Sequence, residues 1–178
     1  MTDKRALRAR MRAVRDGHDR THPLPVPSAF AGLLHGARTI ASYMPVGAEA
    51  DPAPFARAAL TAGLRLALPH VIDRATPLRF LHWDGASPLA AGPFGLLQPP
   101  PDAPPATPNI ILTPLVAFDA RGNRLGQGAG HYDRAFAEFP DARRIGIAWS
   151  VQQVDALAPD AWDIPLHAIA TELDWIVP

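Results

Sequence analysis

The chain contains no cysteine, only one lysine and no long hydrophobic run. Without cysteine it can form no disulfide, thiolate nucleophile or cysteine-based zinc site, so a disulfide-stapled secreted module is excluded. No window approaches the roughly 18 continuous apolar residues of a membrane-spanning helix. We therefore expect a cytoplasmic protein with no membrane partner.

An excess of charge is also absent, because 17 basic residues balance 17 acidic ones. The whole chain therefore has no general attraction for nucleic acid. The basic residues are nevertheless uneven, with seven of them in the first 20 positions. Over residues 3–15, Leu7, Met11 and Val14 recur at helical spacing, which predicts an amphipathic helix. Its separate cationic row consists of Lys4, Arg8, Arg12 and Arg15.

Segments typical of strands and helices alternate along the chain. The predicted strands are Arg38–Met44, Leu64–Leu68, Leu78–Trp83, Ile110–Thr113, Arg144–Trp149, Ala168–Thr171 and Trp175–Val177. Asp51 and Pro52 predict the start of a helix that Gly63 ends, which gives a strand, helix, strand crossover. The proline-dense segment 92–108 reads as an extended, solvated surface loop.

These patterns predict one α/β domain over residues 1–178. We expect a three-layer α/β/α arrangement of the Rossmann-like kind. Its sheet is open and mostly parallel, with helices on both faces.

A glycine-rich loop, RLGQGAGHYDR, runs from Arg124 to Arg134 between a predicted strand and a predicted helix. Glycines at 126, 128 and 130 free the backbone for left-handed conformations, so that successive amides can converge on a phosphate. The alternative is that the glycines only build tight turns and that Asp133 only caps the helix of residues 134–139.

Together with its surroundings, this loop resembles the signature of the 5-formyltetrahydrofolate cyclo-ligases, PLVAFDxxGNRLGxGxGxYDR. Four further stretches follow the order and spacing of that family: KRALR, SYMPVGAEAD, PFGLLQP and GIAWSVQQVDALAPDAWDIPLHAIATE. The resemblance covers nearly the whole chain, and the glycine loop is its most specific part.

The resemblance implies Mg²⁺- and ATP-dependent closure of 5-formyltetrahydrofolate to 5,10-methenyltetrahydrofolate, with release of ADP and phosphate. Such chemistry depends on positioning and on neutralising phosphate charge. The partner it implies is a small reduced folate, and we expect a monomer that binds no nucleic acid.

The resemblance also implies roles for individual residues. Asp133 would bind Mg²⁺ and act in catalysis with Arg124 and Tyr132. ATP would contact Lys4, Arg8, Arg124, Leu125, Gly126, Gln127, Gly128, Ala129, Gly130, His131 and Tyr132. Folate would contact Met44, Glu49, Gln127, Gly128, Ala129, Gly130, His131 and Tyr132.

Simpler roles stay open for several of these side chains. The sequence is equally compatible with Lys4 and Arg8 on an ordinary solvated helix face, and with Met44 packed in the hydrophobic core. Glu49 also fits a loop carboxylate favoured by a nearby helix N-terminus. Tyr132 either stacks on the substrate or packs the loop against the sheet.

The sequence departs from the family pattern at three places. His131 replaces the first of two adjacent tyrosines, and Gln127 and Ala129 leave the middle of the loop uncharged. His167 stands where the pattern generally has an aspartate that can serve as a second metal ligand, although Asp163 is a candidate substitute. Two further hypotheses are therefore a diverged ATP-using enzyme for another pterin or small acid, and an RNA-binding module built on the basic first helix.

Overall fold

The computed structural model describes residues 3–178. Its helices are α1 (Lys4–Asp16), α2 (Ser28–Leu33), α3 (Ala53–Thr61) and α4 (His131–Glu138), with short 3-10 turns η1 (Pro93–Gly95) and η2 (Ser150–Gln152). The main strands are β1 (Thr39–Ala41), β2 (Arg65–His70), β3 (Arg79–Trp83), β6 (Ile110–Pro114), β9 (Arg143–Ile147), β10 (Ala168–Ala170) and β11 (Trp175–Ile176). Two small hairpins pair β4 (Ala90–Ala91) with β5 (Leu97–Gln98), and β7 (Ala117–Phe118) with β8 (Arg124–Leu125).

The central sheet has seven strands in the order β11-β10-β9-β6-β1-β2-β3. The strands from β10 to β2 are parallel, and the edge strands β11 and β3 pair antiparallel to their neighbours. The predicted open, mostly parallel sheet is confirmed.

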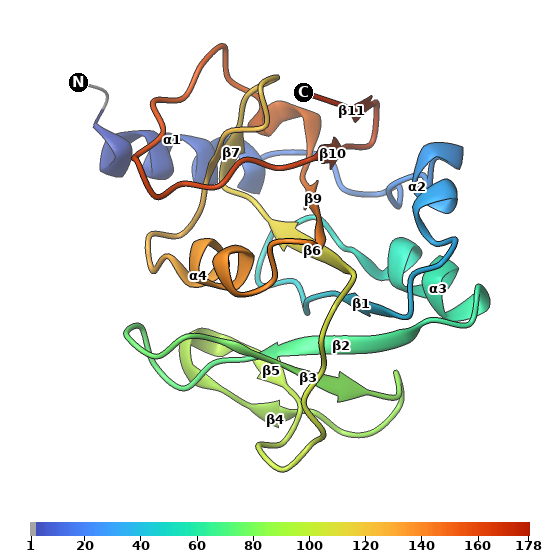
Figure 1. The fold of residues 1–178 in the computed structure, drawn as a ribbon. Coiled ribbons are helices and arrows are strands. Elements are labelled where there is room, and N and C mark those ends of the chain that lie inside the picture. The colour runs from blue at the N-terminus through green and yellow to red at the C-terminus, as the bar shows by residue number, and fades with distance from the viewer. Residues whose placement is uncertain (1–2) are drawn as a thin grey trace.

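Helices cover both faces of this sheet (Figure 1), as the sequence predicted. Ile40 and Leu112 face one side, where they belong to a core cluster with Phe30 of α2 and Phe55 of α3. Alternate residues of the same strands, such as Ile111, join a second cluster that includes Phe136 of α4. Because side chains of a strand alternate between faces, this division produces three layers.

The first helix forms over the predicted residues, but its buried stripe consists of Leu7, Met11 and Arg15, whereas Val14 of the predicted stripe is exposed. Asp3 caps the helix, since its carboxylate accepts hydrogen bonds from the amides of Arg5 (2.8 Å) and Ala6 (3.2 Å). Leu7 and Met11 are buried and pack on the β7–β8 hairpin, so the apolar stripe fixes α1 beside the glycine loop.

The proline-dense segment 92–108 is more ordered than predicted, and its description as a solvated loop is wrong in part. It contains β5, whose Gln98 is buried and bonds both backbone groups of Val71, at 3.0 Å and 3.2 Å. Further along, the amide of Ala106 donates to the carbonyl of Phe80. Long-range bonds of this kind leave no periodic signal in the sequence.

Among residues 3–178, no helix is long and apolar enough to cross a membrane.

The order of the strands creates a switch point between β1 and β6. From β1 the chain continues to β2 on one side, and from β6 it continues to β9 on the other side. In open α/β sheets the crevice at the carboxyl ends of two such strands is the usual place for a ligand.

Candidate active site

A cavity of about 760 Å³ lies at this switch point. Tyr43, just after β1, and Thr113, at the end of β6, form part of its wall. The cavity is also lined by every residue for which the sequence predicts a binding or catalytic role: Lys4, Arg8, Met44, Glu49, Arg124, Leu125, Gly126, Gln127, Gly128, Ala129, Gly130, His131, Tyr132 and Asp133. The fold thus brings the predicted site together from three separate parts of the chain.

The glycine loop forms one wall of the cavity. Gly128 (φ 102°) and Gly130 (φ 67°) are left-handed, whereas Gly126 is not among the residues with positive φ. Helix α4 begins at His131, earlier than predicted, and no side chain caps it within residues 3–178. The proposal that Asp133 caps a helix of residues 134–139 is therefore wrong, and the first-turn amides of α4 remain available to an anion.

Asp133 is held by Arg124, the first residue of β8. The guanidinium donates from Nη2 to Asp133 Oδ1 and from Nη1 to the carbonyl of Ile164, and it lies 4.6 Å from the ring centroid of Phe136. Burial lowers the pKa of Arg124, although Asp133 opposes the shift, and the guanidinium stays charged at neutral pH. Within residues 3–178, no hydrogen bond reaches Asp133 Oδ2 from the protein, so this oxygen is free for a ligand.

Two more carboxylates lie at this end of the cavity. Lys4 Nζ contacts Asp160 Oδ2 at 2.6 Å and Asp163 Oδ2 at 3.4 Å. Burial disfavours the ammonium, but the bond to Asp160 and the charge of Asp163 together raise the pKa of Lys4. We call the region lined by Lys4, Arg124, Asp133, Asp160 and Asp163 the Asp133 end.

His167 does not belong to the cavity. Its Nδ1 lies 3.0 Å from the backbone nitrogen of Arg144, and its Nε2 lies 3.0 Å from the guanidinium of the same residue. Of the two positions considered for a second metal ligand, the structure places Asp163 on the cavity wall and His167 outside it.

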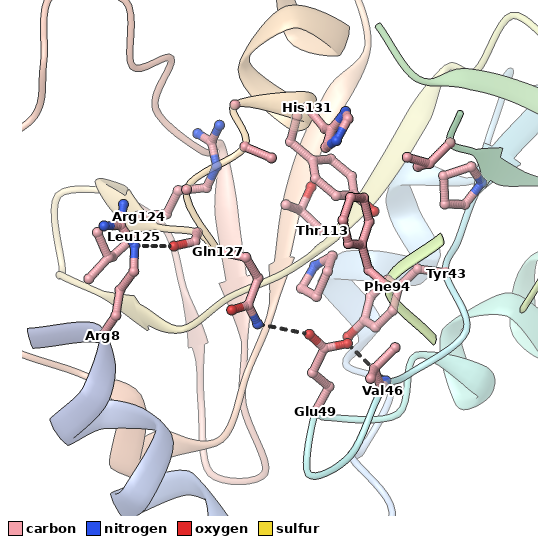
Figure 2. Close-up of a pocket in the computed structure, with 18 of the residues that line it drawn as sticks. Arg8, Tyr43, Val46, Glu49, Phe94, Thr113, Arg124, Leu125, Gln127 and His131 are labelled. Atoms are coloured by element: carbon pink, nitrogen blue, oxygen red, sulfur yellow. Dashed lines mark hydrogen bonds between the residues drawn. The ribbon is translucent and has the colours of Figure 1, made fainter. Parts of the chain in front are cut away.

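The cationic row of α1 contacts the protein instead of open solvent, and its members Arg8 and Arg12 face the glycine loop. Arg8 Nε donates to the carbonyl of Gly126 at 2.8 Å, as Figure 2 shows. Arg12 donates to the side-chain oxygen of Gln127. The interpretation of this row as an ordinary solvated face is therefore wrong, and α1 supplies the charge that Gln127 and Ala129 lack.

Glu49 lies apart from Arg124 in Figure 2, with Gln127 between them. Its Oε2 accepts from the amide of Val46 at 3.0 Å, and its Oε1 lies 3.5 Å from Gln127 Nε2 and 3.9 Å from Arg15 Nη1. Burial raises the pKa of Glu49, although its hydrogen bond with Val46 and the charge of Arg15 oppose the shift. We call the region around Arg15, Asp16, Met44 and Glu49 the Glu49 end.

Tyr132 has one of the two roles that the sequence left open, because it packs the loop against the core; stacking on a substrate stays a prediction. It packs against a core cluster with its ring 6.1 Å from Phe136, and it also lines the cavity. Burial, and then the charge of Glu49, raise the pKa of its phenol, so the hydroxyl stays protonated. For His131, burial and the charge of Arg134 lower the pKa, so this ring is neutral near pH 7.

Several residues of the cavity wall were not predicted. Arg15 is buried and continues the stripe of Leu7 and Met11 at four-residue spacing, a signal present in the sequence. Phe94 is half-exposed with an unusual left-handed backbone (φ 61°), and no local pattern points to it. The hydroxyl of Thr113 is buried without a hydrogen-bond partner among residues 3–178.

The two ends of the cavity suit different chemistry. Cations, free amides and oxygen ligands at the Asp133 end suit phosphates and a hard divalent cation. At the Glu49 end, a buried carboxylate with tyrosine and methionine nearby suits a planar ring that carries hydrogen-bond donors.

Comparisons with known proteins agree with this geometry. The sequence model of the 5-formyltetrahydrofolate cyclo-ligase family matches residues 1–172. A 5-formyltetrahydrofolate cyclo-ligase of Escherichia coli is 34% identical over 143 residues (76% of this chain and 78% of the relative), and that of Mycolicibacterium smegmatis is 32% identical over 156 residues (83% and 80%).

Solved structures of similar proteins extend the agreement to the fold. A 5,10-methenyltetrahydrofolate synthetase from Aquifex aeolicus superposes with a TM-score of 0.78 at 25% identity, covering 99% of this chain and 93% of that one. The enzyme of that name from Mycoplasma pneumoniae gives 0.70 at 25% identity, covering 96% and 99%. The chain therefore belongs to the 5-formyltetrahydrofolate cyclo-ligase family.

Proposed function

We propose that this protein converts 5-formyltetrahydrofolate to 5,10-methenyltetrahydrofolate with ATP, releasing ADP and phosphate. The observation that carries the proposal is the single cavity in which the cationic row of α1, the glycine loop, Asp133 and Glu49 meet. Membership of the cyclo-ligase family supports the same reaction.

ATP binds with its phosphates at the Asp133 end. The amides of the glycine loop and the uncapped first turn of α4 donate to phosphate oxygens, and Lys4 and Arg8 add positive charge from α1. Arg124 positions Asp133 through its paired guanidinium.

The donor atoms at this end fit Mg²⁺, which prefers oxygen and needs only one or two carboxylates besides phosphate and water. Asp133 Oδ2 is the first such donor, and Asp163 lies on the same wall. Among residues 3–178 no group of three potential ligands could hold a metal by itself, so phosphate oxygens are part of the proposed shell. When bound, the ion would neutralise charge on the β- and γ-phosphates.

The folate ring binds at the Glu49 end. Glu49 accepts hydrogen bonds from the ring, Met44 packs against it, and Tyr132 lies beside the reacting group. The formyl oxygen attacks the γ-phosphorus and ADP leaves, which forms an iminophosphate. The neighbouring folate nitrogen then attacks the formyl carbon, loses its proton, and phosphate leaves with the formyl oxygen. The protein contributes alignment of the two substrates and stabilisation of phosphate charge.

The proposal extends to a monomeric, cytoplasmic enzyme in which residues 1–178 act as one domain. A cysteine-free sequence suits a reducing compartment. Light scattering on the active protein checks the monomer.

The test is the formation of the methenyl product, followed by its absorbance, with purified protein, 5-formyltetrahydrofolate and Mg²⁺-ATP. We expect product and ADP in equal amounts, and no product without ATP or after chelation of Mg²⁺. Thermal-shift measurements are made with ATP alone, with folates alone and with both together. They distinguish this activity from the two alternatives, an ATP-using enzyme for another pterin or small acid and an RNA-binding module. Stabilisation by ATP but by no folate, with no product at any enzyme concentration, would contradict the proposal.

A further inference from the structure

Arg15 is a buried guanidinium that the proposed reaction has not yet used. Only 6% of the residue is exposed, and it lines the Glu49 end of the cavity. Its Nε and Nη1 have no hydrogen-bond partner within residues 3–178. These two nitrogens are enclosed by protein, whereas Nη2 is not among the enclosed atoms and is the nitrogen that a ligand in the cavity would meet. Leaving donors of a charged group buried and unpaired is costly, so an acceptor at Nη2 would stabilise this guanidinium.

The neighbouring carboxylates do not supply that acceptor. Glu49 Oε1 lies 3.9 Å from Arg15 Nη1, and Asp16 Oδ1 lies 3.9 Å from Arg15 Nε. Both distances exceed a hydrogen bond, but both place negative charge beside the guanidinium. One cation between two carboxylates repels a further anion such as a phosphate, so the missing acceptor is a neutral oxygen.

Arg15 and Glu49 together present donors next to acceptors along one edge of the cavity. The proposed substrate has the complementary edge, because its 2-amino-4-oxo ring carries two adjacent nitrogen donors followed by a carbonyl oxygen. We propose that Arg15 binds the carbonyl oxygen at ring position 4 while Glu49 accepts from the two nitrogen donors. This inference rests on the proposed function and adds a residue that selects a 4-oxo ring over a 4-amino ring.

The test compares Arg15→Met with Arg10→Met on the exposed face of the same helix. Binding is measured by calorimetry, without ATP, for two reduced folates, one with oxygen and one with an amino group at ring position 4. The amino compound also lacks the hydrogen on N3, so each variant is compared with the unmodified protein for each compound separately. A buried charge-assisted hydrogen bond is lost only for the oxo compound, so its affinity should fall about 10- to 100-fold in Arg15→Met. The amino compound should change less than about threefold, and Arg10→Met should leave both unchanged.

A merely structural role for Arg15 predicts a different result. The two compounds would then weaken equally and the unfolding temperature would drop, which would overturn the inference. Arg15→Lys retains the charge and guards against a loss of folding in Arg15→Met. Because a lysine lacks the second donor of the fork, we expect it to recover only part of the preference for the oxo compound. An unchanged oxo-to-amino ratio in a folded Arg15→Lys and Arg15→Met would also overturn the inference.

The two proposals fail in distinguishable ways. If the unmodified protein neither binds nor converts 5-formyltetrahydrofolate, both the proposed function and this inference are contradicted. If the unmodified protein is active and both Arg15 variants keep the preference for the oxo compound, only the role of Arg15 fails.

Discussion

The Asp133 end and the Glu49 end of the cavity differ in how their charges are paired. At the Asp133 end, Arg124 is bonded to Asp133, and Lys4 is bonded to Asp160. At the Glu49 end, Arg15 and Glu49 stand 3.9 Å apart, and the guanidinium has unpaired donors among the described residues.

This difference indicates two ways of preparing for a ligand. In the proposed reaction, the paired charges would hold Asp133 in place before the phosphates arrive, so that little reorganisation is needed when charge develops. At the Glu49 end, the proposed contacts of the ring with Arg15 and Glu49 would provide selectivity, because a ring with another pattern of donors and acceptors leaves these charged groups without a partner. Changes at the Asp133 end should therefore affect turnover most, and changes at the Glu49 end should affect binding.

The largest effect is expected from Asp133→Asn. The amide cannot replace the carboxylate as a ligand for Mg²⁺ or as the ionic partner of Arg124, so kcat should fall by at least about 1,000-fold. The measurement is product formation over a range of Mg²⁺ concentrations. Asp141→Asn, at an exposed site, is the matched control, and a kcat within tenfold of the unmodified protein would remove Asp133 from catalysis.

Glu49→Gln should raise the KM for the folate about 10- to 100-fold with a smaller effect on kcat. Burial raises the pKa of Glu49 above its ordinary value of 4.5, and the carboxylate is the binding form. Folate binding should therefore be complete above this raised pKa and weaken as the pH falls through it. In Glu49→Gln the affinity should be low and flat over the same range. Exposed Glu138→Gln should keep the full pH profile, and a Glu49→Gln profile identical to it would contradict the assignment.

A smaller effect is expected from Gly128→Ala. The backbone at this position has φ 102°, which an alanine adopts only with strain, and the new methyl group would touch the Arg8 guanidinium at 3.5 Å. We expect the KM for ATP to rise about tenfold, since loop strain of about 1–2 kcal/mol acts on the phosphate site. Steady-state kinetics with ATP varied checks this. An equal rise in the KM for the folate would mean that this part of the loop acts on both substrates, and would contradict its assignment to the phosphates.

The smallest effect is expected from His131→Tyr, which introduces the residue of the family pattern. The His131 ring is neutral near pH 7, because burial and Arg134 lower its pKa, so no charge is lost. The value of kcat/KM should stay within about threefold between pH 7 and 8, as measured by initial rates. A larger change would show that this histidine makes a specific contact with substrate.

Much of the site was predictable because its signals are local. The glycine spacing of 126, 128 and 130 and the cationic row of α1 depend on short stretches of sequence, and the structure places both on the cavity wall. The mostly parallel sheet was predictable for the same reason, since β1, α3 and β2 follow one another along the chain.

The rest depends on contacts between distant residues. Helical spacing placed Arg15 both in the cationic row and four residues after Met11 in the buried stripe, and only the structure shows that this residue, unlike exposed Arg10, is buried at the cavity. The order in segment 92–108 depends on Gln98, which bonds Val71 in another part of the chain. The structure was needed to show that position 167 lies outside the cavity.

The most direct test is a crystal structure with Mg²⁺, a non-hydrolysable ATP analogue and 5-formyltetrahydrofolate bound together. We predict phosphate density on the amides of residues 126–130, Mg²⁺ between those phosphates and Asp133, and the folate ring on Glu49. Density for the ring at the Asp133 end, or for the phosphates beside Glu49, would contradict the division of the cavity into two ends.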